Sequence, residues 1–208
     1  CLIHGKPPAK VLPLRTLSLA QLKAFDCGSV RHPQFPDQQL QPGETIPTLV
    51  ELFNLIASLD TPVSRRVTFN IETKIFPPRP DLTPTPEAFA RLLVDAIHAH
   101  GLVNRVVVQS FDYRTLKWVK ELDPKIATSQ LTERNFVDLI AAAKAIDADY
   151  ISPDWKSITP DMVRDFQAQG LKGAPWTANS IESWELLVGM GVDEIITDDP
   201  AGLIEYLQ

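Results

Sequence analysis

The feature that most constrains this chain is a repeated order of elements: a short apolar stretch of strand length, a loop, and an amphipathic helix. The order occurs six times between residues 66 and 207. The predicted strands cover residues 66–72, 105–109, 125–129, 149–152, 173–177 and 194–197, and the predicted helices cover residues 86–100, 112–121, 135–145, 159–169, 181–189 and 200–207. Strands that are each followed by a helix run parallel, because the helix returns the chain across the sheet. The sequence therefore predicts an α/β fold around a parallel sheet.

The helix predicted at residues 86–100 has the clearest ends. Thr85 can cap its free N–H groups, and Pro86 suits the first helical position. Gly101 follows the last turn, where a glycine commonly ends a helix. One face of this helix is apolar and consists of Phe89, Leu92, Leu93, Ala96 and Ile97.

Two architectures fit six such units. A (β/α)8 barrel needs eight, whereas a doubly wound open sheet can stop at five or six. Residues 1–65 offer helices near 17–25 and 48–59 and a proline-rich loop, but no two further clear strands. The sequence contains neither GxGxxG nor GxxxxGK[ST], which removes the usual nucleotide-binding motifs of the open sheet. Periodicity alone leaves the two architectures open.

Composition excludes several classes of protein. With 208 residues and 44% hydrophobic residues, the chain can bury a sizeable core. A net charge of -6 argues against a nucleic-acid partner. No apolar run reaches the roughly 20 residues of a membrane helix, so no transmembrane segment is predicted. Nothing from Cys1 onward has the pattern of a signal peptide, although a segment upstream could hold one.

The chain has two cysteines, Cys1 and Cys27. They show no CxxC pattern and no Cys/His ligand spacing, which argues against a zinc site. A disulfide between them can form, but two lone cysteines are more often free thiols.

The predicted strand around residue 70 has one apolar and one polar face, because strand side chains alternate. Its polar face carries Asn70, Glu72 and Lys74, which would point into a barrel. An acid and a base on an inward face are costly unless they are paired, solvated or bound to a metal. They also lie at the carboxyl-terminal end of the strand, where barrel enzymes place their active sites. A functional site is favoured here, with a structural Glu72–Lys74 ion pair as the alternative.

Other predicted strands also end in polar or aromatic residues. Gln109 and Phe111 follow the second strand, and Trp176 lies at the end of the fifth. Trp176 fits a substrate site and a packing role equally well. The aspartates in these segments precede predicted helices, so capping is the favoured role for Asp112, Asp198 and Asp199.

Four segments together resemble the glycerophosphodiester phosphodiesterase family. They are residues 70–74 (NIETK), 109–112 (QSFD), 175–179 (PWTAN) and 191–200 (GVDEIITDDP). Residues 17–28 and 46–49 resemble the linker that precedes the Glu-x-Lys strand in that family. Each motif is weak alone, but their order matches over nearly the whole chain. The resemblance implies a TIM (β/α)8 barrel lacking its first two strands in this chain, as a single partial domain over residues 1–208.

The resemblance also implies a reaction and its residues. The family hydrolyses glycerophosphodiesters to an alcohol and sn-glycerol 3-phosphate with a divalent cation, usually Ca2+ or Mg2+. Glu72 would be a metal ligand, and Lys74 a catalytic residue near the phosphate. The remaining predicted site residues are substrate-binding, namely Gln109, Phe111, Trp176 and Asn179. The expected partner is a small-molecule diester, and the oligomeric state is left open.

The sequence departs from the family in its first motifs. The His-Arg motif, the Glu-x-Asp pair and the following His-Asp motif are not found, and His4 is followed by Gly5 rather than Asp. We expect the first two barrel strands to precede Cys1. Glu72 would then be the single family metal ligand of this chain. One carboxylate holds Ca2+ poorly, so the 208 residues alone are expected to be inactive and poorly stable.

Two alternatives are kept. One is a lipid phosphodiesterase on the same barrel, of the phospholipase D or sphingomyelinase D type. The other is a degenerate, non-catalytic barrel that binds phosphate ligands. The long proline-rich insertion before residue 46 resembles that of exported bacterial enzymes, so the periplasm is favoured over the cytoplasm.

Overall fold

The computed structural model describes residues 1–35, 38–134 and 138–208. These residues form two compact units. The larger unit contains residues 68–75 and 85–208, and the smaller unit contains residues 1–67 and 76–84.

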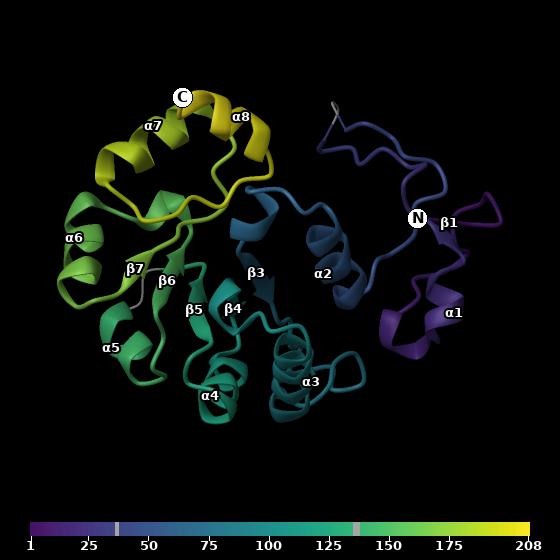
Figure 1. The fold of residues 1–208 in the computed structure, drawn as a ribbon, viewed down its shortest axis with the longest axis horizontal. Helices are drawn as coiled ribbons and strands as arrows, with labels where there is room; N and C mark the ends of the chain where they lie inside the picture. The colour runs from purple at the N-terminus through teal and green to yellow at the C-terminus, as the bar shows by residue number, and fades with distance from the viewer. Residues whose placement is uncertain (36–37, 135–137) are drawn as a thin grey trace. The chain divides into compact units, whose positions relative to one another are not determined.

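The larger unit is built on a parallel five-stranded sheet whose strands follow chain order (Figure 1). Its strands are β3 (Phe69–Glu72), β4 (Val106–Ser110), β5 (Ala127–Thr132), β6 (Tyr150–Pro153) and β7 (Lys172–Gly173). Because all strands are parallel, their carboxyl-terminal ends lie along one rim of the sheet. The parallel sheet that the sequence predicts is confirmed.

A helix follows each strand, as the alternation predicts. The helices are α3 (Pro86–Ala99), α4 (Tyr113–Leu122), α5 (Leu139–Lys144), α6 (Pro160–Ala168), α7 (Ile181–Met190) and α8 (Pro200–Tyr206). The first residues of the helix predicted at 135–145 lie outside the described residues. Short 3-10 turns occur at Val103–Arg105 and Trp155–Ser157.

Side-chain caps fix where these helices begin. Thr85 accepts a hydrogen bond from the Ala88 N–H at 3.2 Å, and Asp199 accepts one from the Gly202 N–H at 2.9 Å. Asp112 accepts one from the Arg114 N–H at 3.1 Å. The predicted capping roles of Thr85, Asp112 and Asp199 are confirmed. The capping role predicted for Asp198 is wrong, because α8 begins at Pro200 and its cap is Asp199, whereas the Asp198 carboxylate accepts from Asn179.

The end of the sheet is less regular than predicted. The strand expected at 173–177 is reduced to β7 and one further bridge, between Asp154 and Trp176. Hydrogen bonds to β6 nevertheless continue along this segment, because the N–H groups of Ala174 and Trp176 donate to the carbonyls of Ile151 and Pro153, each at 3.0 Å. Residues 194–197 form no regular strand, but the Ile196 N–H donates to the Pro175 carbonyl at 3.0 Å and the Ala178 N–H donates to the Ile196 carbonyl at 2.9 Å. This segment therefore extends the hydrogen bonding beyond β7.

The two faces of the sheet bury different side chains. One face carries a small layer of Val107, Tyr150 and Ala174. The other face packs against the helices in a larger core, which includes Ile151, Val163, Phe166, Trp184 and Leu187. The face that carries Val107 and Tyr150 is the inner face of the sheet, because the helices cover the opposite one.

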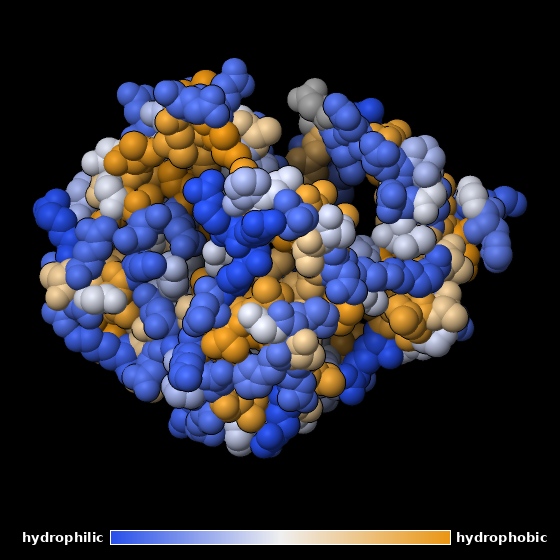
Figure 2. Space-filling model, viewed as in Figure 1, coloured by the Kyte–Doolittle hydropathy of each residue, from blue (hydrophilic) through white to orange (hydrophobic). Residues whose placement is uncertain are grey.

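The outer sides of α7 and α8 leave apolar side chains in contact with solvent (Figure 2). Ile181 is 61% exposed and Ile204 is 58% exposed. Leu186, Val188 and Leu207 are also exposed. A cluster of this kind is unusual on a monomeric surface, where contiguous apolar patches are small.

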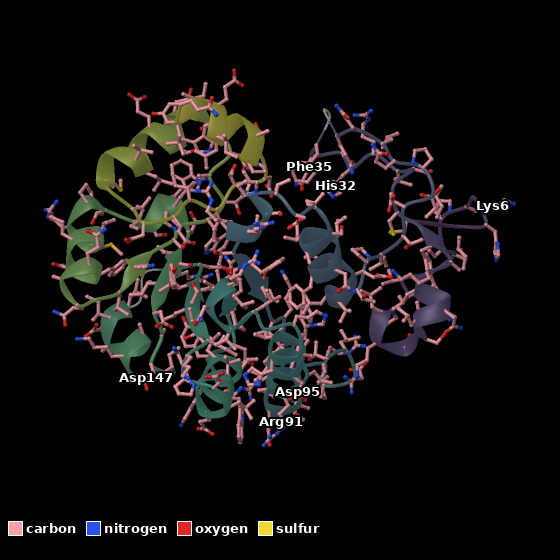
Figure 3. The ribbon with its side chains drawn as sticks, in the orientation of Figure 1. Lys6, His32, Phe35, Arg91, Asp95 and Asp147 are labelled. Carbon is pink, nitrogen blue, oxygen red and sulfur yellow. A yellow bond between two sulfur atoms is a disulfide. The ribbon has the colours of Figure 1, made fainter. Side chains whose placement is uncertain are left out.

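The smaller unit has little regular structure. Its helices are α1 (Leu19–Leu22) and α2 (Leu49–Ser58), its strands are β1 (Leu2–Ile3) and β2 (Phe25–Asp26), and 3-10 turns occur at Leu14–Thr16 and Ser64–Arg66. The two strands pair antiparallel, which the sequence did not predict. The helix predicted at 17–25 is shorter than expected, because Ser18 caps it and β2 begins at Phe25. Further along, the ring of His32 lies 5.1 Å from that of Phe35, measured between centroids (Figure 3).

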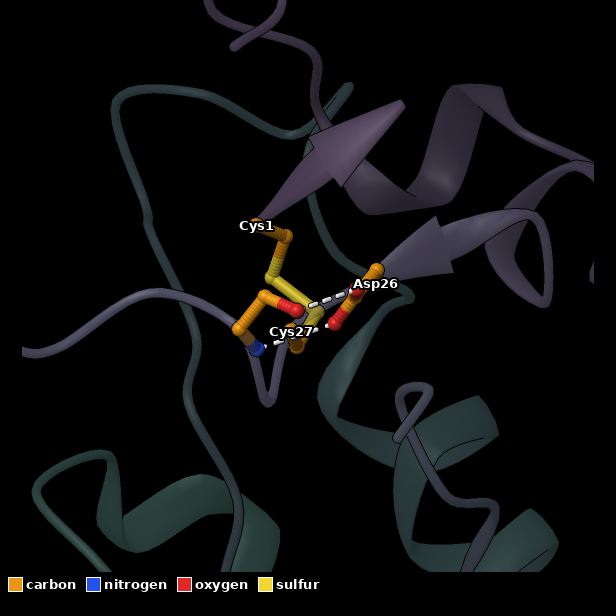
Figure 4. The surroundings of a disulfide bond; sticks show 4 residues. Cys1, Asp26 and Cys27 are labelled. Atoms are coloured by element: carbon orange, nitrogen blue, oxygen red, sulfur yellow. Dashed lines mark hydrogen bonds between the residues drawn. A yellow bond between two sulfur atoms is a disulfide. The ribbon is translucent and has the colours of Figure 1, made fainter. Parts of the chain in front are cut away.

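A disulfide joins Cys1 to Cys27 across this strand pair (Figure 4). The more common outcome for two lone cysteines, free thiols, is therefore wrong here. Next to the disulfide, Asp26 accepts hydrogen bonds from the Ser29 hydroxyl at 2.6 Å and the Ser29 N–H at 2.9 Å. The Ser29 hydroxyl lowers the pKa of the Asp26 carboxyl, and backbone N–H groups add to this effect.

Within the described ranges, no helix combines the length and the apolar character needed to cross a membrane.

Candidate functional site

Glu72 is the last residue of β3 and lies at the carboxyl-terminal rim. Its register partner is Gln109, whose own partner on β5 is Ser129, and Ser129 pairs with Tyr150. Register partners in a parallel sheet share a face. Glu72 is therefore on the inner face with Tyr150, as the alternation predicts.

The carboxylate of Glu72 is partly enclosed, with its side chain 24% exposed. Its Oε1 lies 3.3 Å from the Nζ of Lys74, whose side chain is 65% exposed. The same oxygen is buried and has no partner in hydrogen-bonding geometry, so the contact with Lys74 is an ion pair without a directed hydrogen bond. The ion pair that the sequence offered as an alternative therefore exists.

Gln109 lies beside Glu72 at the end of β4. Its Oε1 accepts a hydrogen bond from the Nδ2 of Asn70 at 3.0 Å. This contact fixes the amide and leaves its nitrogen as the available donor. Two further bonds hold the ends of β3 and β4 together: the Thr73 N–H donates to the Gln109 carbonyl at 2.9 Å, and the buried Ser110 hydroxyl donates to the Thr73 carbonyl at 2.8 Å.

Trp176 and Phe111 form an aromatic wall on the same rim. Their ring centroids are 5.5 Å apart and their planes are nearly perpendicular. The indole Nε1 of Trp176 donates to the Ser152 carbonyl at 2.9 Å, which anchors the ring to the end of β6. Phe111 is 44% exposed. The structure therefore brings these two predicted residues together.

Asn179 is occupied by the segment that follows the irregular sheet edge. Its Nδ2 donates to the Asp198 carboxylate at 2.7 Å, and its Oδ1 accepts from the Asp198 N–H at 2.8 Å. The Thr197 hydroxyl also donates to Oδ1, at 3.1 Å. These contacts hold residues 197–198 against residue 179, so Asn179 has a positioning role in the fold beside its predicted contact with substrate.

Asp112 is close to the rim but is committed elsewhere. Its carboxylate accepts two hydrogen bonds from the guanidinium of Arg114, at 2.9 and 2.6 Å. The Arg114 guanidinium holds the pKa of Asp112 below its ordinary value. Its charge is therefore used by the start of α4 rather than by a ligand.

A pocket that the sequence did not predict lies at the ends of β4 and β5. It has a volume of about 550 Å³, and it is lined by Phe111, Tyr113, Leu131, Thr132, Glu133 and Arg134. The predicted strand ended at residue 129, whereas β5 continues to Thr132. The polar residue Gln130 made the last part of β5 look like a loop in the sequence. Glutamine is usually exposed, whereas Gln130 is fully buried. The mouth residues Glu133 and Arg134 were missed for that reason.

Two histidines, His98 and His100, lie at the carboxyl-terminal end of α3. His98 bonds Asp123 at 2.8 Å, and the ring of His100 bonds the Ala96 carbonyl at 2.8 Å. Residues 1–35, 38–134 and 138–208 contain no group of three His, Cys, Asp or Glu side chains that could hold a metal ion. The carboxylate of Glu72 fits one position in a cation's ligand shell, but the described side chains do not complete that shell.

Comparisons with known proteins show the family of the chain. The sequence model of the Glycerophosphoryl diester phosphodiesterase family matches residues 4–202. The glycerophosphodiester phosphodiesterase of Caldanaerobacter subterraneus subsp. tengcongensis is 30% identical over 199 residues, which cover 94% of this chain and 73% of that protein.

Two crystal structures share the fold. A Silicibacter pomeroyi protein assigned as a glycerophosphoryl diester phosphodiesterase has a TM-score of 0.82 at 24% identity, and the match covers 92% of this chain and 68% of that one. An Oleispira antarctica phosphodiesterase, solved in complex with its product sn-glycerol-3-phosphate, has a TM-score of 0.74 at 22% identity, covering 100% of this chain and 72% of that one.

The matching structures settle the choice between the two architectures, since they are TIM barrels rather than open sheets. The five parallel strands of this chain are part of such a barrel. The family match over residues 4–202 includes both the rim with Glu72 and the segment at 191–200. The chain belongs to the Glycerophosphoryl diester phosphodiesterase family.

Proposed function

We propose that the protein carrying this sequence hydrolyses glycerophosphodiesters to an alcohol and sn-glycerol 3-phosphate at the rim defined by Glu72. The observation that carries the proposal is the inward carboxylate of Glu72, with one buried oxygen free of hydrogen bonds and the ammonium of Lys74 at 3.3 Å. Membership of the family supports the reaction, and the product bound to the Oleispira antarctica relative supports the substrate class.

The side chains of this rim suit a phosphodiester. Lys74 offers a compact positive charge and hydrogen-bond donors to phosphate oxygens, which stabilises the charge that develops as the diester is attacked. The amide nitrogen of Gln109 is a further donor beside it. The edge-to-face pair of Phe111 and Trp176 covers the carbon-bearing part of the substrate and excludes water from it.

We further propose that the protein uses a divalent cation, Ca2+ or Mg2+, with Glu72 as one ligand. A hard cation prefers carboxylate oxygen and needs several such ligands. Glu72 supplies one of them, so the others have to come from outside the described side chains. The disulfide between Cys1 and Cys27 supports an oxidising compartment such as the periplasm.

The test is made in the full-length gene product. Glu72→Gln keeps the size of the side chain and removes its charge, so we expect kcat/KM for glycerophosphocholine to fall at least about 100-fold and the affinity for the cation to fall with it. Lys74→Gln should lower kcat while leaving cation affinity unchanged, because Lys74 is proposed to meet the phosphate. Metal titration and initial rates measure both effects.

Glu87→Gln is the matched control, since Glu87 is also ion-paired, with Arg91 at 2.9 Å, but belongs to α3 and is not one of the proposed site residues. It should leave both kcat/KM and the affinity for the cation at the wild-type level. A Glu72→Gln protein with full activity and unchanged cation affinity would refute the site. A wild-type protein that binds glycerophosphodiesters without cleaving them would favour the non-catalytic barrel instead.

A further inference from the structure

The pocket at the ends of β4 and β5 adjoins the proposed reaction site. Phe111 belongs to both, because its ring contacts Trp176 and also lines the pocket. Neighbouring strands lie about 4.8 Å apart, so β5 is roughly 10 Å from β3 and Glu72. A diester whose phosphate lies at Glu72 and Lys74 can therefore extend one arm into this pocket.

The lining of the pocket combines aromatic rings with charge. Phe111 is 44% exposed. The hydroxyl of Tyr113 donates to the Leu131 carbonyl at 3.0 Å, so this polar atom is occupied and the ring is what remains for a ligand. Glu133 and Arg134 are both solvent-exposed, and neither forms an ion pair with another side chain in the described part of the chain.

We propose that this pocket binds the alcohol headgroup of the diester and that Glu133 makes it selective for headgroups carrying an ammonium group, such as choline or ethanolamine. The inference rests on the proposed function, since it assigns the second arm of the same substrate. A carboxylate attracts an ammonium ion, and an aromatic face such as that of Phe111 adds a cation–π contribution.

The experiment compares two substrates of the full-length gene product, glycerophosphocholine and glycerophosphoglycerol, which differ in headgroup charge. Wild-type protein should prefer glycerophosphocholine. Glu133→Gln should lower kcat/KM for glycerophosphocholine about fivefold, because an exposed charge pair contributes about that much. It should leave kcat/KM for glycerophosphoglycerol unchanged. Glu133→Lys should reverse the preference.

Glu185→Gln on α7 is the control for the loss of one exposed carboxylate and should leave kcat/KM unchanged for both substrates. Equal losses on both substrates in Glu133→Gln, or no loss on either, would overturn the headgroup assignment while leaving the proposed function intact. Wild-type protein without activity on any glycerophosphodiester would overturn the proposed function, and this assignment with it.

Discussion

At the scale of single residues, Glu72 combines enclosure with charge. Its Oε1 is buried without a directed hydrogen bond and lies 3.3 Å from the ammonium of Lys74, which offsets part of the cost of enclosing the carboxylate. An ion-paired carboxylate on the inner face at the carboxyl-terminal rim lies where barrel enzymes place their active sites. The alternation of side chains placed Glu72 inward, and the register with Gln109 agrees with that placement.

The residue with the clearest effect of pH on stability is Glu51, at the start of α2. Its carboxylate contacts the ammonium of Lys23 at 2.5 Å and accepts from the Thr48 N–H at 2.7 Å. The Lys23 ammonium and the Thr48 N–H lower the pKa of Glu51 from 4.5 to about 2. The charged form is therefore favoured by folding, and its contribution is present above pH 4.5 and lost as the pH falls toward 2.

We expect Glu51→Gln to weaken this pH dependence. Glutamine keeps the capping box with Thr48 but has no charge to lose, so its free energy of unfolding should fall less than that of wild type between pH 5 and pH 2. Urea denaturation followed by circular dichroism across this range measures the difference. Glu185→Gln should behave as wild type. Parallel curves for wild type and Glu51→Gln would contradict the assignment.

At the scale of elements, the strands of the larger unit are hydrogen-bonded in a five-stranded sheet, whereas the strands of the smaller unit form one short pair in its described residues. Its strand pair, β1 with β2, is two residues long on each side. A pair this short is marginal in water. The disulfide between Cys1 and Cys27 closes the chain over a separation of 26 residues and supplies the constraint that the ladder lacks.

We expect removal of the disulfide to destabilise the smaller unit. Closing a loop of this length restricts the unfolded chain and is worth about 3 kcal/mol, so the double variant Cys1→Ser, Cys27→Ser should unfold at lower temperature than wild type. Calorimetry with and without reductant checks this, because reductant should lower the transition of wild type only. Alkylation of protein taken from cells should find no free thiol, and a full yield of alkylated cysteine would contradict the proposed compartment as well.

At the scale of the whole molecule, two features set what the 208 residues can do alone. The described side chains supply Glu72 but no complete set of metal ligands. The strand β3 stands at the end of the sheet order, and α7 and α8 expose apolar residues such as Ile181 and Ile204. Sheet edges and apolar patches of this kind favour association.

We expect the purified 208-residue chain to have no measurable activity on glycerophosphocholine and to associate at micromolar concentration. Light scattering after size exclusion should report species larger than the 23.1 kDa monomer, and Ile204→Lys, which places a charge on the apolar surface of α8, should reduce them. The Lys120→Gln variant, made outside this surface, should not. Measurable hydrolysis of glycerophosphocholine, or a stable monomer, would show this expectation to be wrong.

The sequence by itself determined the order of strands and helices, the capping residues Thr85 and Asp199, and the face on which Glu72 lies. These features depend on residues within a turn or two of each other, where the periods of helix and strand act directly. The family motifs likewise needed only their order along the chain.

The tertiary structure alone decided the rest. It set the end of β5 and hence the pocket with Glu133, the partners of Asn179, and the pairing of Cys1 with Cys27. Each of these depends on groups far apart in the sequence. Gln130, for example, is fully buried because neighbouring segments cover it, and a local pattern carries no information about such neighbours.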